Sequence, residues 1–429
     1  MNRKEKRERK EEINILNNLV TVIKQYFPEL INQFNGLTDE RNQSYIKYEM
    51  KVIFMVRLMG FMCEMKSMHG MTRELNTKEA IKNIALMCRL ELEEIPHCDT
   101  INDVFEKVKV EEIEEIRKYI INRLIRGKII KKYKVRDRYY HIIIDGTGLA
   151  TSRKQYNEKC LVKQKKDKKG NEYKEYSTYV LEAKLVVGDM VFSIGSEFVE
   201  NIKNGKSKQD CETEAFKRLA KKIKNEYPRL PIIISGDALY ASEPIINICK
   251  EMNWKYLIRF KEGTIPSLYK EFETVVSEEN ESKYTDYEFV TGLDYKEKSI
   301  NVIKYTEKEK GTEFVYITDL PIRNKNIKET ISVGRKRWKI ENEGFKMQKH
   351  GTFDIGHLYS RDQTAIKVHY LIIQIAHILR QLVERGVTEI KDLGLKIKEI
   401  SLTLKKELIS SIINLTVYKK IQLRFDWII

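Results

Sequence analysis

The chain has 429 residues, which is too long for one ordinary hydrophobic core and long enough for two or three domains. Its 79 Lys and Arg residues outnumber its 63 Asp and Glu residues, and the formal net charge of +16 favours polyanionic partners such as nucleic acid. The six cysteines are scattered without a Cys-x-x-Cys pair, and no His stands at zinc-ligand spacing, which argues against a disulfide framework and a structural zinc.

The hydropathy of the two chain ends bears on location. The first twelve residues, MNRKEKRERKEE, are charged throughout and precede no apolar stretch of signal-peptide type, so we interpret them as a solvated basic arm. The apolar run from Val368 to Leu379 contains two His and one Gln and is too short to cross a bilayer. We therefore expect a cytoplasmic protein without a membrane partner. Abundant lysine and isoleucine are equally typical of an AT-rich genome, so the motifs must decide whether the basic charge has a function.

A helical N-terminal region is predicted over residues 1–130. Apolar residues recur there at spacings of three and four, in the segments 13–27, 45–65, 80–92 and 110–130. The segment EEIPHCDTINDVFEKV has a Pro-containing turn followed by Thr100 and Asp103, which can cap a helix start. Two interpretations stay open, a DNA-binding helix-turn-helix and a helical hairpin that only packs. Periodicity alone favours the second.

From residue 139 the pattern becomes that of a sheet. YYHIIIDGTG is an apolar run that ends in an acid and two glycines, which is typical of a buried central strand. YSTYVLEAKLVVG and MVFSIGSEF follow as strands on either side of Gly188 and Asp189 and predict a hairpin. A helix over 208–227, the strand PIIIS, a helix over 244–252 and the strand WKYLIRF complete the order of a mixed sheet with helices on its faces.

The remaining patterns divide the chain after this helical region into four parts. They are the first part of an α/β core over 135–263, a β-rich insertion over 264–330, the last part of the core over 331–385, and a helical C-terminal region over 386–429. In mixed sheets, functional residues gather at the carboxyl ends of central strands. Asp145 and Asp237 are expected at such ends.

Asp145 and Asp237 form a candidate metal site. Each follows a run of isoleucines and precedes small residues that leave room for a ligand. Taken singly, either aspartate is an ordinary turn-former or helix cap. Two carboxylates on adjacent strands repel each other unless a cation lies between them. Oxygen ligands without nearby His or Cys favour Mg²⁺ or Mn²⁺ over zinc, and two such ions about 4 Å apart suit phosphodiester chemistry.

A third carboxylate is then expected on a helix that follows the sheet. In the segment RKRWKIENEGF, Arg337 and Glu341 lie four residues apart on one predicted helical face. Trp338 and Phe345 lie on a stripe that can pack inward. The alternative interpretation of Arg337 and Glu341 is an ordinary surface ion pair, which contributes little stability.

Three segments, HIIIDGTG, PIIISGDALY and RKRWKIENEGFKMQK, together resemble the DDE transposases of bacterial insertion sequences. Their acids are separated by 92 residues (237 − 145) and 104 residues (341 − 237). The similarity covers residues 135–385 and concerns the branch with a Tyr-x-x-Arg-x-x-x-Glu-x-x-x-x-x-x-Lys signature and a β-rich insertion before the last acid. It implies an α/β fold with a ribonuclease-H-like mixed sheet and flanking helices.

The resemblance assigns the site residues one by one. Asp145, Asp237 and Glu341 become the catalytic residues and the ligands of two Mg²⁺ ions, for which Mn²⁺ can substitute. Arg337 takes the position of the signature arginine that contacts DNA phosphate. The other expected DNA-binding residues are Tyr240, Lys346 and Lys349.

Two signature positions differ in this chain. Gly334 stands in place of the tyrosine, and Gln348 in place of the lysine, with Lys349 one position further on. Glu343 is the alternative third acid. Choosing it puts Lys339 and His350 at the arginine and lysine positions, which is a poorer fit.

The resemblance also implies the partners. They are DNA, at the element ends and at the target, and a second copy of the chain when DNA is bound, with no small-molecule substrate. The helical N-terminal region over 1–130 is expected to bind the element ends. The alternatives are a ribonuclease-H-like nuclease without strand transfer and a non-catalytic DNA-binding descendant. Some members of the branch hold a flipped base against a tryptophan in the β-rich insertion. Here all three tryptophans lie outside 264–330, so the stacking candidates there are Tyr284, Tyr287 and Tyr295.

Overall fold

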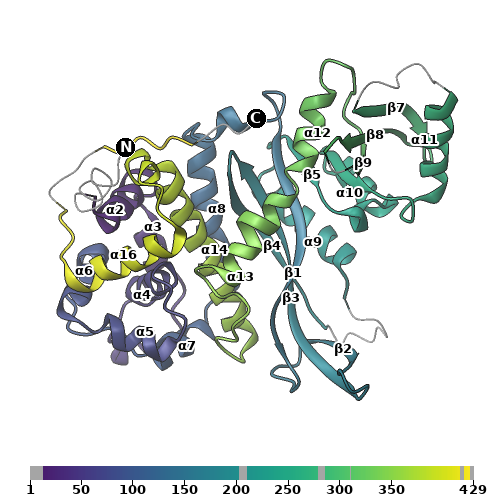
Figure 1. The fold of residues 1–429 in the computed structure, drawn as a ribbon. Helices are drawn as coiled ribbons and strands as arrows, with labels where there is room; N and C mark the ends of the chain where they lie inside the picture. The colour runs from purple at the N-terminus through teal and green to yellow at the C-terminus, as the bar shows by residue number, and fades with distance from the viewer. Residues whose placement is uncertain (1–12, 202–209, 279–285, 310, 416–419, 426–429) are drawn as a thin grey trace.

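The structure, a computed structural model, describes residues 13–201, 210–278, 286–309, 311–415 and 420–425. The basic arm over residues 1–12, Tyr284 and Trp427 lie outside these ranges. None of the helices in the described ranges combines the length and the apolarity needed to cross a membrane. A lobe of helices lies on one side of the molecule and a mixed sheet on the other (Figure 1).

The helical lobe joins the two ends of the chain. The long helix α14 packs against α2, α4, α7 and α8, and α16 packs against α2 and α6, so purple and yellow helices lie side by side (Figure 1). The α-helices of the lobe are α2 (Ile15–Tyr26), α3 (Leu30–Asn35), α4 (Met50–Met62), α5 (Met68–Leu75), α6 (Lys78–Cys88), α7 (Cys98–Phe105), α8 (Val110–Arg126), α14 (Gln363–Gly386), α15 (Thr388–Asp392) and α16 (Ile397–Ser410).

The helix predicted after the Pro-containing turn is α7. It begins at Cys98, and the side chain of His97 accepts a hydrogen bond from the backbone N–H of Asp99, so the cap is His97 and not Thr100 or Asp103. The ends of the next helix, α8, carry the charges that suit the helix dipole. Its first turn contains acidic residues and its last turn contains arginines.

Within the described residues, nine strands form one mixed sheet in the order β2-β3-β1-β5-β6-β9-β8-β7, with β4 paired to β3. β1 is antiparallel to β3 and parallel to β5, and β6 is parallel to β5 and antiparallel to β9. The strands are β1 (Tyr140–Ser152), β2 (Leu161–Lys166), β3 (Glu172–Val187), β4 (Met190–Val199), β5 (Ile232–Ser235), β6 (Lys255–Phe260), β7 (Tyr287–Asp294), β8 (Ser299–Glu307) and β9 (Thr312–Thr318).

Several predicted elements are confirmed. β3 and β4 form the hairpin, with Val187 opposite Met190 and Gly188 at a φ of 60°, a left-handed conformation that glycine adopts without strain. The helices α9 (Glu212–Glu226) and α10 (Glu243–Glu251) flank β5, as expected from the order of the patterns. The region predicted to be strand-rich differs at its start, where residues form the helix α11 (Pro266–Glu278) before β7.

The last part of the core crosses the sheet as a broken helix. It consists of α12 (Ile327–Arg335), the π-helix η4 (Ile340–Phe345) and α13 (Lys346–His350). η4 packs against β1 and β4. A π-helical turn contains more residues than an α-helical turn, and such turns are frequent at functional sites. This arrangement places the third candidate acid over the strand that carries Asp145.

Candidate active site

Asp145 and Asp237 lie on neighbouring parallel strands. Tyr140 pairs with Ile232 and Ile143 with Ser235, and each aspartate follows two residues after the last pair. β5 ends at Ser235, so Asp237 follows a strand end as predicted. Asp145 does not, because β1 continues to Ser152 along its antiparallel partner β3. The expected strand end at Asp145 is therefore wrong, although the parallel pairing stops beside it.

The charge of Asp145 is unfavourable in its surroundings. The pKa of this carboxyl is raised to about 6, mainly by burial and in addition by the carboxylates of Asp237 and Glu212. The guanidinium of Arg337 opposes this effect, with its Nη1 atom 4.0 Å from Oδ2 of Asp145. Burial and like charge both disfavour the ionised form. These are conditions that a bound cation would relieve.

Asp237 has the helix-cap role, which is the ordinary one of the two that the sequence left open. Its Oδ1 atom accepts a hydrogen bond of 2.9 Å from the backbone N–H of Leu239, so it caps the short 3₁₀-helix η3 (Ala238–Tyr240). Its charge also acts on Asp145, as the raised pKa of that carboxyl indicates. The cap fixes the Asp237 carboxylate beside the acidic cluster.

Glu341 and Glu343 have different partners. Burial lowers the pKa of Lys349, and the carboxylates of Glu341 and Asp145 oppose that change. The ammonium group of Lys349 therefore interacts electrostatically with both carboxylates. Glu343 instead accepts a hydrogen bond of 2.7 Å from Arg385, which also binds Asp189. Glu341 is the glutamate of η4 that shares a basic partner with Asp145.

The three predicted acids do not all lie within 4.8 Å of one another among the described side chains. They therefore do not converge as closely as direct ligands of one ion would. The donor set nevertheless fits a divalent cation, because it consists of carboxylate oxygens whose mutual repulsion such an ion removes. Asp145, Asp237 and Glu341 are the residues that could hold it.

Sequence reasoning missed a fourth acid beside this cluster. Glu212, the first residue of α9, accepts a hydrogen bond of 2.6 Å from the Tyr179 hydroxyl and one of 2.7 Å from the Tyr240 hydroxyl. In sequence, an acid at a helix start has a sufficient explanation in the helix dipole. Only the approach of β3 and η3 distinguishes Glu212 from its neighbours.

The two tyrosines correct two expectations. A Cβ atom on Gly146 would lie 2.3 Å from the Tyr179 hydroxyl, and one on Gly236 would lie 2.8 Å from the Tyr240 ring. Gly146, which follows Asp145, and Gly236, which precedes Asp237, therefore make room for tyrosines, and the space after Asp145 that we expected for a ligand is occupied. The ring of Tyr240 is 3% exposed, so the contact with DNA that we expected from it is not available in this structure.

At the first position that differs from the signature, Gly334 in α12, a tyrosine from strand β9 occupies the space beside the glycine. A Cβ atom on Gly334 would lie 2.7 Å from the ring of Tyr316 in β9. Burial raises the pKa of Tyr316, and nearby arginines, including Arg337, lower it. A tyrosine therefore stands next to Arg337 although position 334 is glycine.

The second departure coincides with the π-helix. Gln348 is fully buried, and its amide nitrogen donates to Gln374 at 2.8 Å. The wider turn of η4 begins at Ile340, before Gln348 in the sequence. It shifts the direction of the side chains that follow by about one residue compared with an α-helix. Lys349 consequently faces the acids, whereas Lys346 is exposed.

Aromatic residues near the site are arranged partly as expected. Phe345 is buried, but the inward position predicted for Trp338 is wrong, because its side chain is 50% exposed. The guanidinium of Arg337 lies 4.7 Å from the centre of the Trp338 ring. Of the stacking candidates, Tyr287 and Tyr295 are both half-buried.

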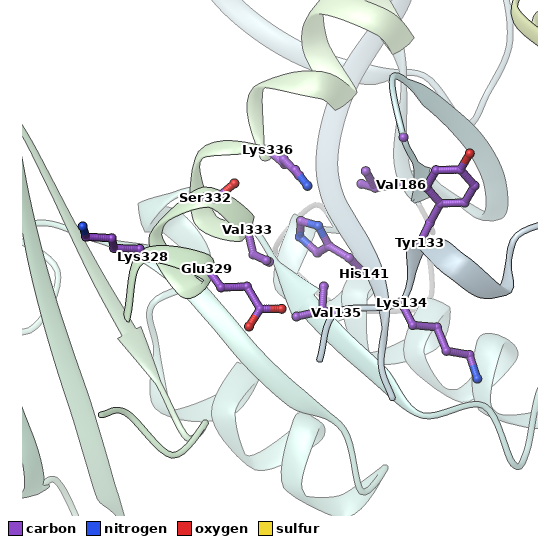
Figure 2. A pocket seen from close by; sticks show the side chains of 11 residues that line it. Tyr133, Lys134, Val135, His141, Val186, Lys328, Glu329, Ser332, Val333 and Lys336 are labelled. Carbon is purple, nitrogen blue, oxygen red and sulfur yellow. The ribbon is translucent and has the colours of Figure 1, made fainter. Parts of the chain in front are cut away.

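A cavity of about 310 Å³ lies near the start of β1, between α12 and the β3–β4 hairpin (Figure 2). His141 and Lys336 point toward it. Burial lowers the pKa of His141 to about 3, so its ring is neutral at physiological pH, and its Nε2 atom lies 2.9 Å from the Ser235 hydroxyl. None of the predicted site residues lines this cavity, which separates it from the acidic cluster.

Two family models match the chain. The model of the Transposase DDE domain group 1 matches residues 190–418, which is more than half of the chain and includes Asp237 and Glu341. A model described as DDE_Tnp_1-associated matches residues 31–119, in the helical lobe. Asp145 lies before the first match. No curated protein matches the chain.

Proposed function

The chain belongs to the DDE transposases of domain group 1, and we propose that it binds the ends of a mobile element, cleaves the DNA strands there and joins them to target DNA. Transposases of this family act on DNA and use divalent metal ions. The finer proposal names Asp145, Asp237 and Glu341 as the catalytic residues, with Mg²⁺ as the cofactor.

The observation that carries this proposal is the register between β1 and β5. It sets Asp145 and Asp237 side by side, where their negative charges repel each other, and the guanidinium of Arg337 lies 4.0 Å from the Asp145 carboxylate. Divalent ions, when bound, would activate the attacking water or 3′-hydroxyl and stabilise the departing oxygen. Arg337 and Lys349 are the basic groups beside Asp145, and we assign to them the binding of DNA phosphate next to the reacting one.

Two features support the finer resemblance to the insertion-sequence branch. The antiparallel strands β4, β3 and β1 continue into the parallel strands β5 and β6, an order that supports a ribonuclease-H-like core. Tyr316 and Lys349 stand near Arg337 and Glu341, and they supply the residue types that the signature lacks at positions 334 and 348.

We also propose Glu212 as a positioning residue of the same site. Two tyrosine hydroxyls fix its carboxylate, and they come from the strand next to Asp145 and from the 3₁₀-helix that Asp237 caps. Its negative charge adds to the potential that attracts cations, and its hydrogen bonds tie the start of α9 to β3 and to η3.

The test is strand cleavage and joining on DNA that carries the element's terminal repeats, with Mg²⁺ and a target plasmid. We expect nicks at the repeat ends and joined products from the wild type. Asp237→Asn should lose more than about 100-fold in rate, beyond the 10–100-fold typical of residues that only support metal ligands. Asp189→Asn is the matched control, since Asp189 lies in the β3–β4 turn against Arg385. Cleavage without joining would identify a nuclease, and no cleavage with Mg²⁺ or Mn²⁺ would contradict the proposal.

A further inference from the structure

Three side chains with nitrogen and sulfur ligand atoms meet on the surface of the helical lobe. They are His69 in α5, His97 before α7 and Cys98 at the first position of α7. One ligand atom from each lies within 4.8 Å of the other two. Their separation in the sequence hid this cluster, because His69 stands 28 residues before His97 (97 − 69) and only the packing of α5 on α7 brings them together.

We propose that His69, His97 and Cys98 form a binding site for a transition-metal cation of the Zn²⁺ class, separate from the acidic cluster. Imidazole nitrogen and thiolate sulfur are the ligands that such ions prefer, in contrast to the oxygen ligands that suit Mg²⁺. The proposal does not depend on the transposase chemistry, and its failure would leave that chemistry untouched.

The geometry is close to what the ion needs. In a tetrahedral zinc site, neighbouring ligand atoms lie about 3.3–3.6 Å apart. The Cys98 sulfur lies 3.8 Å from Nε2 of His97, and the two His rings meet edge to face with centres 6.0 Å apart. Small side-chain rotations would close these distances, and they are available because both imidazoles are exposed.

Local contacts leave the right atoms for the ion. Nδ1 of His97 lies 3.3 Å from the Asp99 carboxylate and, in the metal-free protein, accepts a hydrogen bond from the Asp99 N–H. With an ion on Nε2, Nδ1 would carry the ring proton and donate it to that carboxylate instead. The Cys98 sulfur lies 3.8 Å from each of the two ring nitrogens of His97, and Nε2 is the one that this arrangement leaves for the ion. A carboxylate beside a metal-binding imidazole is a common outer partner, because it fixes the ring and raises its basicity. The fourth position remains for water or for the second Asp99 oxygen.

A bound ion would connect α5 to the start of α7, two helices that are separated in the sequence by α6. These helices lie in the segment 31–119 that matches the DDE_Tnp_1-associated model. A ligand that binds the folded protein alone stabilises it in proportion to the logarithm of its concentration. We therefore expect this cation to raise the thermal stability of the helical lobe.

Co²⁺ is the probe, because a cysteine thiolate bound to Co²⁺ gives a charge-transfer absorption that oxygen ligands at the acidic cluster do not give. The full-length, metal-free protein is titrated with Co²⁺ and then with competing Zn²⁺. We expect one equivalent of the thiolate band, its displacement by Zn²⁺, and a higher melting temperature with Zn²⁺.

The variants separate ligation from folding. Cys98→Ser should abolish the band. His69→Ala and His97→Asn should weaken Co²⁺ binding by at least about 10–100-fold, the loss caused even by outer partners. Asn at position 97 keeps a good helix cap, so the fold is retained. Cys211→Ser is the matched control, because that thiol is also free and is the more exposed of the two. Absence of the band in the wild type, its persistence in Cys98→Ser, or its loss in Cys211→Ser would overturn the proposal.

Discussion

The carboxyl of Asp145 carries two opposite pH dependences. Its pKa is raised to about 6, mainly by burial, so the folded protein binds this proton more tightly than the unfolded chain does. For the metal-free protein, stability is therefore lost as pH rises from the ordinary range of an aspartate through about 6. Cation binding needs the ionised carboxylate and is lost as pH falls through the same value.

The predicted loss of cation binding at low pH can be measured by titrating Mn²⁺ into the protein at a series of pH values around 6. We expect the affinity of the wild type to fall with a slope approaching tenfold per pH unit below about 6. Asp145→Asn should bind weakly with a much smaller slope, because the titrating group is gone. An affinity of the wild type that does not change between about pH 5 and 8 would contradict the role given to Asp145.

Glu212 tests whether charge or architecture matters at the start of α9. Glu212→Gln removes the negative charge, so we expect Mn²⁺ affinity to fall about tenfold, as for other outer partners of metal ligands. Tyr179→Phe with Tyr240→Phe keeps the charge but removes both hydrogen bonds, which should cost about 1–3 kcal/mol of unfolding free energy. Glu214→Gln in the same first turn is the control. Unchanged Mn²⁺ affinity in Glu212→Gln would leave this acid only a structural role.

Individual site residues can be predicted from the sequence where a local sequence pattern marks them. Asp145 and Asp237 follow isoleucine runs, and the structure sets them on neighbouring strands. Glu212 was not predictable, because its two tyrosine partners lie 33 and 28 positions away along the chain. The expectation that Tyr240 contacts DNA did not include its hydrogen bond to Glu212, which holds the tyrosine inside the protein.

Among the elements, the π-helix η4 has the clearest consequence. An α-helix through Glu341 would direct position 348 toward the acids, whereas the wider turn brings Lys349 there and buries Gln348. A single-sequence pattern has no signal for such a turn except the one-residue offset from the signature. The same limit applies to β1, whose continuation past Asp145 depends on its pairing with β3.

This offset predicts unequal effects of two lysines. Lys349→Gln should reduce cleavage of end DNA by at least about tenfold, because its ammonium group interacts with Glu341 and Asp145, where the proposed reaction would place the phosphate. Lys346→Gln removes the same charge from an exposed position and should mainly weaken salt-dependent DNA binding. A larger loss of cleavage in Lys346→Gln would show that the lysine function lies at position 346.

The contact between α8 and the sheet depends on buried charge. Arg117 is fully buried, donates to Ser196 in β4 at 2.7 Å, and lies 3.8 Å from Glu114. Glu182 in β3 accepts from the same serine at 2.6 Å. Removing one partner of a buried ionic network is costly, because the remaining charges lose their compensation.

We therefore expect Arg117→Met to lower the unfolding free energy by about 3–5 kcal/mol in urea titrations. Adding Glu182→Gln should restore part of this loss, since the second change removes an uncompensated carboxylate. The exposed Arg126 on the same helix provides the control Arg126→Met, which should change stability little. An equal, small effect of both arginine changes would contradict the network.

For the whole molecule, the sequence predicted the succession of helical region, mixed sheet and returning helices. It did not predict that α14 would join the N-terminal helices while also packing on β4. These contacts join residues that are far apart in the sequence. The hydrophobic pattern of α14 is compatible with packing on a sheet or in a helical bundle, so it does not identify the partner. If the helical lobe binds the DNA ends, as the resemblance implies, this junction connects it to the candidate site at β1 and β5.

The measurement that tests the central claim most directly compares two neighbouring glutamates of η4. End DNA is cleaved in Mg²⁺ by the wild type, by Glu341→Gln and by Glu343→Gln, with folding checked by thermal melting. We predict that Glu341→Gln abolishes cleavage, whereas Glu343→Gln, which loses only its contact with Arg385, cleaves at close to the wild-type rate. Normal cleavage by Glu341→Gln together with an inactive Glu343→Gln would contradict the site formed by Asp145, Asp237 and Glu341.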